Sequence, residues 1–326
     1  MNIVIFGASG MLGFDLSSYL KSLPNHGYNI VWQIATPTRN EVDISDRINV
    51  QHYLTTMKAA GYDVVINCAA ATDVNGIQSC VSEETNSYSI NALAPKYIAE
   101  ACKNLNMRLV HISTDYVYSD KSLDTSTYHD EFPVNIYGYH KLIGELFVKN
   151  AMPSGYTIIR VGCLYGMHRE KSFVHKFLKN AASSIRHKGK CKDCSPTVVY
   201  YQMSTPTSTM FVCDIILRVL QNGIYGTVTT SPQGAANRFE FASKIIELAN
   251  ETGAFPDELN SIMVKKDFCE LNHFIPSTSC MGSINQTSHI GYDFPWTWED
   301  DLKRFMEDNS EQLSTWFKML LKEKEK

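Results

Sequence analysis

The first half of the chain alternates short runs of apolar residues with longer stretches whose apolar positions recur at helical spacing. The strand-like runs are 2–6, 29–34, 63–68, 108–113 and 156–161, and the helical stretches are 11–23, a segment from 46 onward, 89–105 and 136–150. Strands that alternate with helices in this way are typical of a parallel sheet covered by helices on both faces. We therefore predict an α/β fold, a doubly wound Rossmann sheet that binds NAD(P), for residues 1–165.

From residue 166 onward the alternation is less regular. Helical patterns recur at 211–221, 239–250 and 298–322, and a basic stretch runs from 187 to 194. We predict that residues 166–326 form mainly a smaller mixed α/β domain that binds the substrate. Some of its segments are expected to return to the Rossmann sheet.

The composition is that of an ordinary globular protein, with 44% hydrophobic and 20% charged residues. The formal net charge of −4 gives no general attraction to nucleic acid or to anionic lipid. No apolar run approaches the roughly 20 residues that span a bilayer. Because the chain enters its first strand at once, we expect no secretion signal and a cytoplasmic protein.

The cysteines favour a reduced protein without a metal. Their number is nine, which is odd, and most of them stand inside apolar runs, as small hydrophobic residues do. Only Cys191 and Cys194 have the spacing of metal ligands, and no second pair of this kind follows. A solvated, lysine-rich loop is therefore the preferred interpretation of this stretch, and its role stays open.

A glycine-rich turn follows the first predicted strand and precedes the first predicted helix. Such a turn lets backbone N–H groups approach a pyrophosphate, which the positive end of the helix dipole also attracts. We predict that this turn binds a dinucleotide, although glycines can also serve packing alone. The residues expected to contact the cofactor are Gly7, Ser9, Gly10, Met11, Leu12 and Gly13.

The residues after the second predicted strand bear on the choice between NAD and NADP. An acidic residue there would bind the ribose hydroxyls of NAD, but the strand runs into Ala35-Thr-Pro-Thr-Arg39 without a carboxylate. The guanidinium of Arg39 can instead bind the 2′-phosphate of NADP. A surface arginine without such a role is the alternative. The sequence therefore favours NADP(H) over NAD(H).

Tyr137 and Lys141 stand four residues apart in a helical stretch, so their side chains share one face of the helix. A free tyrosine has a pKa of about 10. A neighbouring ammonium stabilises the phenolate and lowers that pKa toward the working range, and the lysine can also hold the cofactor ribose. We predict that this pair is catalytic, although the YxxxK spacing by itself is common.

The strand before this helix supplies a third candidate. It ends in Ser113 and Thr114, at the edge where the carboxyl ends of parallel strands meet ligands. A hydroxyl there can donate to a substrate carbonyl and align it for hydride attack. A threonine with no role beyond ending the strand is the alternative. We predict that Thr114, Tyr137 and Lys141 together form the reaction centre.

With these residues in view, the chain resembles an extended short-chain dehydrogenase/reductase, and most of all the dTDP-4-dehydrorhamnose reductases. The resemblance covers nearly the whole length. The segments that carry it are Gly7–Gly13, Val42–Ile44 with Asp46, Val65–Thr72, Asn91–Pro95, Ser113–Val117, Glu131–Asn135, Tyr137-Gly138 with Lys141, Gly144-Glu145, Arg160, Leu164–Gly166, Thr205–Thr207 and Gly223–Tyr225.

The resemblance implies NADPH-dependent reduction of the C4 ketone of a nucleotide-linked 4-keto-6-deoxysugar, in deoxysugar or polysaccharide synthesis. It implies that Thr114, Tyr137 and Lys141 are the catalytic residues, and that Asn91 props the helix near the lysine. It also implies a homodimer. The further cofactor contacts that it implies are Asp43, Ile44, Ala69, Ala70 and Ala71, and the substrate contacts are Thr72, Asp73, Val74, Thr114 and Cys163.

Some residues depart from the family pattern and leave the exact substrate open. Cys163 stands where the rhamnose-forming enzymes usually have a tryptophan, and Ile275-Pro276 stands where an Arg-Pro pair commonly faces the nucleotide phosphates. Lys265, Lys266 or a basic residue of 186–192 is then expected to replace that guanidinium.

Other functions remain as alternatives. One is a non-catalytic NADP-binding regulatory subunit of the same fold, against which the intact catalytic residues argue. A nucleotide-sugar epimerase is another, disfavoured because no cysteine follows Thr114 closely. A reductase of a ketone without a nucleotide is the third. Tyr116 stands where related dehydratases have an acid, which disfavours dehydration.

Overall fold

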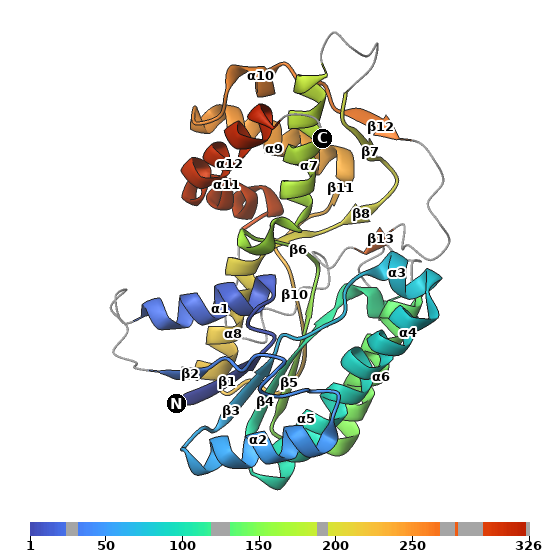
Figure 1. The fold of residues 1–326 in the computed structure, drawn as a ribbon, viewed down its shortest axis with the longest axis vertical. Coiled ribbons are helices and arrows are strands. Elements are labelled where there is room, and N and C mark those ends of the chain that lie inside the picture. The colour runs from blue at the N-terminus through green and yellow to red at the C-terminus, as the bar shows by residue number, and fades with distance from the viewer. Residues whose placement is uncertain (24–31, 119–130, 188–194, 268–277, 280–295, 324–326) are drawn as a thin grey trace.

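A computed structural model describes residues 1–23, 32–118, 131–187, 195–267, 278–279 and 296–323 of the chain (Figure 1). Within them, six strands pair in parallel in the order β10-β5-β4-β3-β1-β2. These strands are β1 (Asn2–Phe6), β2 (Gln33–Ala35), β3 (Val64–Asn67), β4 (Arg108–Thr114), β5 (Tyr156–Val161) and β10 (Gly226–Thr230). The predicted doubly wound α/β fold is confirmed.

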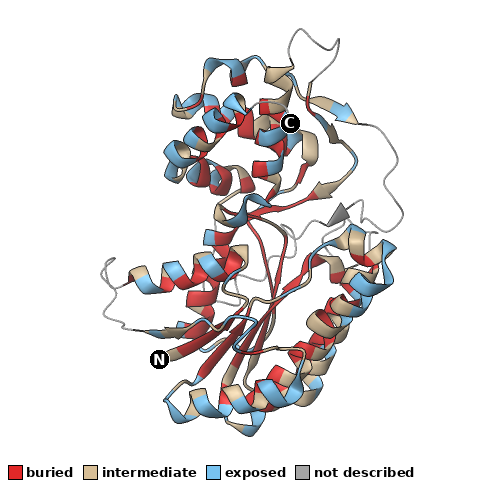
Figure 2. Ribbon diagram, in the orientation of Figure 1, coloured by how far each residue is buried: buried red, intermediate tan, exposed pale blue. Residues whose placement is uncertain are grey.

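The sheet is buried on both faces, as the near-continuous apolar strands predict. Successive side chains of a strand point to opposite faces, so Ile3 and Ile5 join one core while Val4 and Phe6 join the other. Figure 2 shows the strands as the most buried part of this half of the molecule. The helices on the first face are α1 (Met11–Ser22) and α8 (Thr209–Gln221), and those on the second are α2 (Arg47–Ala59), α5 (Ala94–Asn104) and α6 (Ile136–Ala151).

A second lobe, at the top of Figure 1, has a core of its own. Its helices are α7 (Phe173–Arg186), α9 (Arg238–Thr252), α10 (Asp257–Asn260), α11 (Trp298–Asp308) and α12 (Ser310–Lys322). Its short strands are β7 (Thr197–Val199), β8 (Met203–Ser204), β11 (Ala236–Asn237), β12 (Lys265–Asp267) and β13 (Thr278–Ser279). A parallel pair, β6 (Cys163–Tyr165) with β9 (Pro206–Ser208), lies where the chain passes from the sheet to this lobe.

Two segments of the second half belong to the Rossmann sheet. The strand β10 pairs with β5, and α8 packs against α1 over the same face. The division of the chain at residues 165 and 166 stays a prediction.

Two predicted helices are interrupted. The stretch predicted as one helix over 89–105 contains a π-helical turn at Ser89–Leu93 before α5, and it continues α4 (Val81–Tyr88), which follows α3 (Val74–Ser79). The stretch 298–322 is divided at Asn309, whose side-chain amide donates to the carbonyl of Phe305 at 2.8 Å. A polar side chain that bonds to the preceding turn in this way competes with the helical backbone pattern.

Short 3₁₀ turns occupy Asp115–Val117, directly after β4, and His168–Glu170. The predicted strand 29–34 overlaps β2 at its end, and its residues 29–31 lie outside the described ranges. No helix formed by the described residues has the length and apolar character needed to cross a membrane.

Candidate active site

The glycine loop between β1 and α1 is pressed against the end of β3. Gly7 has a φ of +77°, and a Cβ there would lie 2.5 Å from the backbone nitrogen of Ala69. A Cβ on Gly13 would lie 2.4 Å from the carbonyl oxygen of Gly7. Any side chain at either position would therefore force the loop open. The glycines serve packing as well as access, and they bring the loop beside Ala69, as the cofactor prediction requires.

The start of α1 is suited to an anion. Gly10 is its N-cap and supplies no side chain to bond the free N–H groups of the first turn. A helix N-terminus in this state attracts a phosphate through those N–H groups and the helix dipole. The loop also contacts the segment that leads from the sheet to the second lobe. The Nε2 atom of His168 in that segment lies 3.2 Å from the carbonyl oxygen of Ser9.

Ala69 and Ala71 are held by two buried asparagines. The backbone N–H of Ala69 donates to the Asn67 side chain at 3.1 Å. Asn91 accepts from the N–H of Ala71 at 3.0 Å and donates to its carbonyl at 2.8 Å, so one amide clamps both sides of that residue. Asn91 lies in the π-helical turn, a local irregularity that is frequent at functional sites. The family resemblance implied that Asn91 props the helix near the lysine, and the structure shows this clamp on the Ala71 backbone.

The turn after β2 carries the remaining predicted cofactor residues. Arg39 is exposed, and Asp43 and Ile44 are half-buried. The Asp43 carboxylate accepts from the backbone and the hydroxyl of Ser45, at 3.0 and 2.7 Å. These bonds lower the pKa of Asp43, and the charge of Arg39 lowers it further. Arg39 is thus close enough to Asp43 to interact with it electrostatically, at the carboxyl edge of the sheet.

The predicted reaction centre comes together where β4 ends and α6 begins. Asn135 caps α6 by accepting from the N–H of Gly138 at 2.7 Å. A Cβ on Gly138 would lie 2.2 Å from the carbonyl oxygen of Tyr116, so only glycine lets the helix start so near the turn after β4. As a result the buried hydroxyl of Thr114 and the phenol of Tyr137 form a hydrogen bond. Lys141 follows one turn later on the same helix.

Lys141 is almost fully buried, and its ammonium is directed at the sheet. Its Nζ atom donates to the carbonyl oxygen of Ile112 in β4 at 2.7 Å. Burial lowers the pKa of Lys141 to about 8, while the charges of Glu145 and Cys68 oppose that shift. His111 and Cys68 are the other titratable groups that sense this ammonium.

The expectation that Lys141 lowers the pKa of Tyr137 is wrong for this structure. Burial raises the pKa of Tyr137 above its ordinary value, the hydrogen bond with Thr114 opposes the rise, and the charge of Asp115 adds to it. The physical reason is that the ammonium is bound to the β4 backbone, so removal from water dominates at the phenol. Tyr137 is therefore a protonated phenol at neutral pH, which is the form that can give up a proton.

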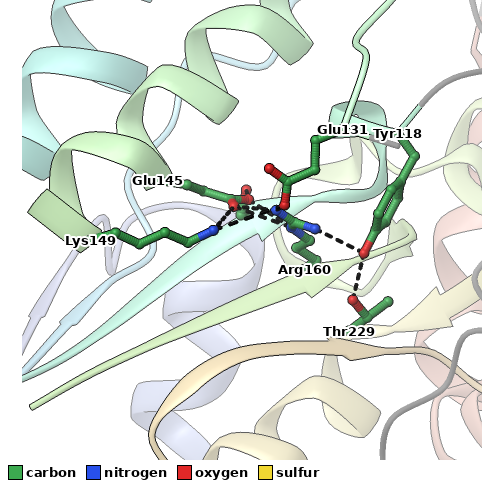
Figure 3. Close-up of polar contacts among 7 residues, drawn as sticks. Tyr118, Glu131, Glu145, Lys149, Arg160 and Thr229 are labelled. Carbon is green, nitrogen blue, oxygen red and sulfur yellow. Dashed lines mark hydrogen bonds and ion pairs between the residues drawn. The ribbon is translucent and has the colours of Figure 1, made fainter. Parts of the chain in front are cut away.

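A buried ionic network lies beneath α6 and was not foreseen from the sequence (Figure 3). The carboxylate of Glu145 accepts from the guanidinium of Arg160, at 3.0 Å to Nε and 2.6 Å to Nη2, and from the hydroxyl of Ser113 at 2.5 Å. Arg160 also bonds Glu131 and donates to the Tyr118 hydroxyl at 3.0 Å. The network therefore ties α6 to β4 and β5 directly beside Thr114 and Lys141.

The residues predicted to face the substrate are dispersed. Thr72 and Asp73 are exposed, and Asp73 caps α3 by accepting from the N–H of Gly76 at 3.1 Å. Val74 is half-buried as the first residue of α3. Cys163 is half-buried on β6, and its sulfur accepts from the guanidinium of Arg238 at 2.9 Å. Of this predicted set, Thr114 contacts the phenol of Tyr137.

Three residues that the sequence did not single out for this role form a chain of contacts that starts at the phenol. The ring of Tyr116 meets the ring of Tyr137 edge-on, with centroids 5.9 Å apart. The Gln202 amide lies 3.5 Å from the Tyr116 hydroxyl, and Arg238 donates to Gln202 at 3.3 Å. Gln202 and Arg238 come from the second lobe, so no local spacing in the sequence relates them to Tyr137.

The other residues named in the sequence analysis either lie outside the described ranges or make contacts within the chain. The described residues contain no cluster of His, Cys, Asp and Glu that could hold a metal, and Cys191 and Cys194 lie outside them. Ile275-Pro276 also lies outside the described ranges. Arg186 donates to the carbonyl of Glu323 at 2.8 Å, and the Lys266 ammonium lies 4.2 Å from the centre of the Tyr200 ring.

The chain is similar over most of its length to proteins of one family. The sequence profile of the RmlD substrate binding domain matches residues 1–311. A dTDP-4-dehydrorhamnose reductase of Mycolicibacterium smegmatis is 32% identical over 260 residues, which are 79% of this chain and 71% of that protein. A spore coat polysaccharide biosynthesis protein of Bacillus subtilis is 30% identical over 250 residues, covering 75% of this chain and 78% of that protein. A crystal structure of dTDP-4-dehydrorhamnose reductase from Bacillus anthracis in complex with NADP has a TM-score of 0.77 and 26% identity, and the match covers 94% of this chain and 98% of that one.

Proposed function

The chain belongs to the RmlD substrate binding domain family, and from this premise we propose that it reduces the C4 ketone of a nucleotide-linked 4-keto-6-deoxysugar with NADPH. It is an NAD(P)-dependent oxidoreductase, and its product serves deoxysugar and polysaccharide synthesis. The observation that carries the proposal is the meeting of Thr114 and Tyr137 at the carboxyl edge of the sheet, on the helix that also bears Lys141.

The protonation states of the two key side chains fit reduction. NADPH, when bound, supplies the hydride that reaches the ketone carbon. Tyr137 then protonates the new alkoxide oxygen, because burial keeps its phenol protonated at neutral pH. The hydroxyl of Thr114 bonds the phenol and is positioned to bond the same substrate oxygen. Lys141, one turn further along α6, would hold the cofactor ribose.

The residues that would hold the cofactor fit a dinucleotide. The uncapped start of α1 and the glycine loop suit its pyrophosphate, and the clamped backbone of Ala69–Ala71 lies beside that loop. Asp43 and Ile44 would border the adenine. Arg39 supports NADP over NAD, since its exposed guanidinium at the end of β2 would bind the 2′-phosphate.

The substrate side of the proposed site comprises Thr72, Asp73, Val74, Thr114 and Cys163. Thr72–Val74 follow the clamped Ala71 directly, so their backbone is anchored next to the cofactor residues. Cys163 borders the Tyr116 ring that contacts Tyr137, as the mutual electrostatic interaction of Cys163 and Tyr116 indicates. A small side chain at this position leaves more room beside the phenol than a tryptophan would.

A spectrophotometric panel tests the proposal. The protein is assayed with dTDP-, UDP-, GDP- and CDP-linked 4-ketosugars, and with ketones that carry no nucleotide, using NADPH and NADH in turn. We expect loss of dihydronicotinamide absorbance with one or more of the nucleotide-linked substrates, and faster with NADPH. Turnover of none of them would contradict the proposal.

Tyr137→Phe tests the proton donor. We expect turnover to fall by about 10²- to 10⁴-fold while the affinity for NADPH stays within about twofold, because only the proton is removed. Tyr139→Phe is the matched control, since Tyr139 lies on the same helix turn and is 44% exposed. Equal turnover of the Tyr137→Phe and Tyr139→Phe proteins would remove Tyr137 from the mechanism.

A further inference from the structure

Arg238 carries a guanidinium from the second lobe to the edge of the reaction centre. It is the first residue of α9, directly after the capping residue Asn237. Its Nη1 atom donates to the Cys163 sulfur at 2.9 Å, and its Nε atom donates to the Gln202 amide oxygen at 3.3 Å. The guanidinium also lies over the Phe173 ring, 5.1 Å from its centre. These three side-chain contacts hold the guanidinium in one orientation.

Among the residues that the structure describes, Arg238 forms no hydrogen bond or ion pair with a carboxylate, although the charge of Asp115 acts on it electrostatically. Its hydrogen-bond acceptors there are a thiol and an amide, and its Nη2 atom makes no hydrogen bond within the same ranges. Buried or half-buried guanidinium groups are normally paired, because removing a charge from water is costly unless an opposite charge compensates it. A guanidinium that is held in place, half-buried and bonded to no carboxylate is therefore suited to an anion that arrives from outside the chain.

Side-chain contacts connect Arg238 to the phenol in one direction, and its neighbour in sequence, Phe239, contacts Lys266 in the other. Toward the phenol, Gln202 lies between Arg238 and Tyr116, whose ring contacts Tyr137. In the other direction, Phe239 follows Arg238, and the Lys266 ammonium lies 4.7 Å from the centre of the Phe239 ring and 4.2 Å from that of Tyr200.

The outer end of this row is aromatic and exposed. Tyr200 contacts Tyr201 with ring centres 5.8 Å apart, and Tyr201 is 50% exposed. From the inside outward, the groups are thus the phenol of Tyr137, the guanidinium of Arg238, and the ammonium of Lys266 with the rings of Tyr200 and Tyr201. A nucleotide sugar has the matching order of sugar, diphosphate and base, and aromatic rings and cations suit a base and a phosphate.

We propose that Arg238 binds the diphosphate of the nucleotide-sugar substrate, an inference that rests on the proposed function. The guanidinium fork bonds phosphate oxygens through Nη2 and the free hydrogen of Nη1, while Gln202 and Cys163 keep it in position. The sequence pointed to Lys265, Lys266 or a residue of 186–192 as the basic group for these phosphates. In this proposal Arg238 takes that role, and the Lys266 ammonium lies over the ring of the next residue, Phe239.

The test compares nucleoside diphosphate binding by the wild-type protein and by Arg238→Met, with NADPH present, in isothermal titration calorimetry. The probes are dTDP, UDP, GDP and CDP, and the corresponding nucleosides without phosphate. We expect the diphosphate that binds the wild type best to bind Arg238→Met about 10- to 100-fold more weakly. The matching nucleoside should bind both proteins equally, and KM for the ketosugar should rise far more than kcat falls.

Arg304→Met is the matched control, because Arg304 also lies over an aromatic ring, 5.2 Å from the centre of Trp296, but is exposed and lies beside the carboxylate of Asp308. It should bind diphosphates as the wild type does. Arg238→Lys keeps the charge without the fork, so we expect an intermediate affinity for the nucleoside diphosphate. This variant replaces Arg238→Met in the comparison if Arg238→Met fails to bind NADPH.

The outcomes separate this inference from the proposed function. Equal binding of a diphosphate by the wild type and by both Arg238 variants would overturn the role of Arg238 and leave the proposed function intact. Weaker binding of the intact ketosugar substrate alone, with free diphosphate unaffected, would also overturn it, because the arginine would then act on the sugar. A wild-type protein that binds no nucleoside diphosphate would contradict both.

Discussion

Arg160 and Arg238 both carry a guanidinium into the protein, and their partners are opposite in kind. Arg160, under α6, meets two carboxylates, Glu145 and Glu131, together with the Tyr118 hydroxyl. Arg238, between the lobes, meets a thiol, an amide and an aromatic ring. The first group is neutralised by the chain itself and so belongs to the framework. The second is held in place and bonded to no carboxylate, with the charge of Asp115 acting on it only electrostatically, so its fork is left for an anionic ligand.

The difference teaches how to tell a structural arginine from a ligand-binding one. Neither burial nor the number of contacts separates the two, because both side chains are fixed by several neighbours. What separates them is whether the contacts supply a compensating negative charge, since an unpaired charge is costly to keep away from water. The four predictions below probe that distinction, beginning with the largest effect.

Arg160→Met should destabilise the protein by about 3–5 kcal/mol, because it leaves the fully buried carboxylate of Glu145 without its partner. The measurement is the free energy of unfolding from urea denaturation. The double variant Arg160→Met/Glu145→Met should regain part of the loss, since it removes both charges together. A loss below about 1 kcal/mol in the single variant would mean that the network is not what holds α6 to the sheet.

Arg238→Met should change the free energy of unfolding by less than about 1 kcal/mol, because no carboxylate among the described residues loses a hydrogen bond and only the Gln202 amide and the Cys163 sulfur lose a donor. The same urea experiment applies. Addition of a nucleoside diphosphate should then raise the midpoint of the wild type and leave that of the variant nearly unchanged. A loss as large as that of Arg160→Met would show that Arg238 is structural after all.

Arg39→Met extends the comparison to an arginine that is exposed. We expect KM for NADPH to rise about tenfold and KM for NADH to stay the same, because the contact proposed for Arg39 is with the phosphate that only NADPH carries. Initial rates with each cofactor give the ratio. An unchanged preference would return Arg39 to an ordinary surface residue.

Glu145→Gln should give the smallest effect, a displacement of the pH profile. Burial holds the pKa of Lys141 at about 8, and the Glu145 carboxylate is the first of the groups that keep it from falling further. Removing that negative charge lowers the pKa of Lys141, so its ammonium is lost at a lower pH. We expect the alkaline limb of kcat/KM near pH 8 in the wild type, and it should move toward acid in the variant.

Glu131→Gln is the control for the pH experiment. It also removes one carboxylate from Arg160 but leaves Glu145 in place, so the alkaline limb should not move. His111 and Cys68, which also face Lys141, are unchanged in both variants. Equal displacement in the two variants would mean that loosening of the network, and not the charge of Glu145, shifts Lys141.

The sequence was sufficient for features that depend on neighbours along the chain. The glycine turn before α1 was predicted because backbone conformation and helix start are set within a few residues. The shared face of Tyr137 and Lys141 follows from helical periodicity, and the strands buried on both faces follow from their unbroken apolar runs. The sequence did not predict the break at Ser89–Leu93, where Asn91 bonds Ala71 across 20 residues, or the break at Asn309, whose side chain bonds the carbonyl of Phe305.

Only the tertiary structure determined which groups the charged and polar side chains contact. The Lys141 ammonium is bound to Ile112, a residue 29 positions away, and burial raises the pKa of the Tyr137 phenol where helical spacing had predicted a lowered one. Asn91 clamps Ala71 across 20 residues, and Arg238 contacts Cys163 across 75. Spacing fixes which side chains share a helix face, but burial and electrostatic partners depend on residues that only folding brings together. The reactive residues could therefore be named from the sequence, whereas their protonation and the guanidinium beside them required the fold.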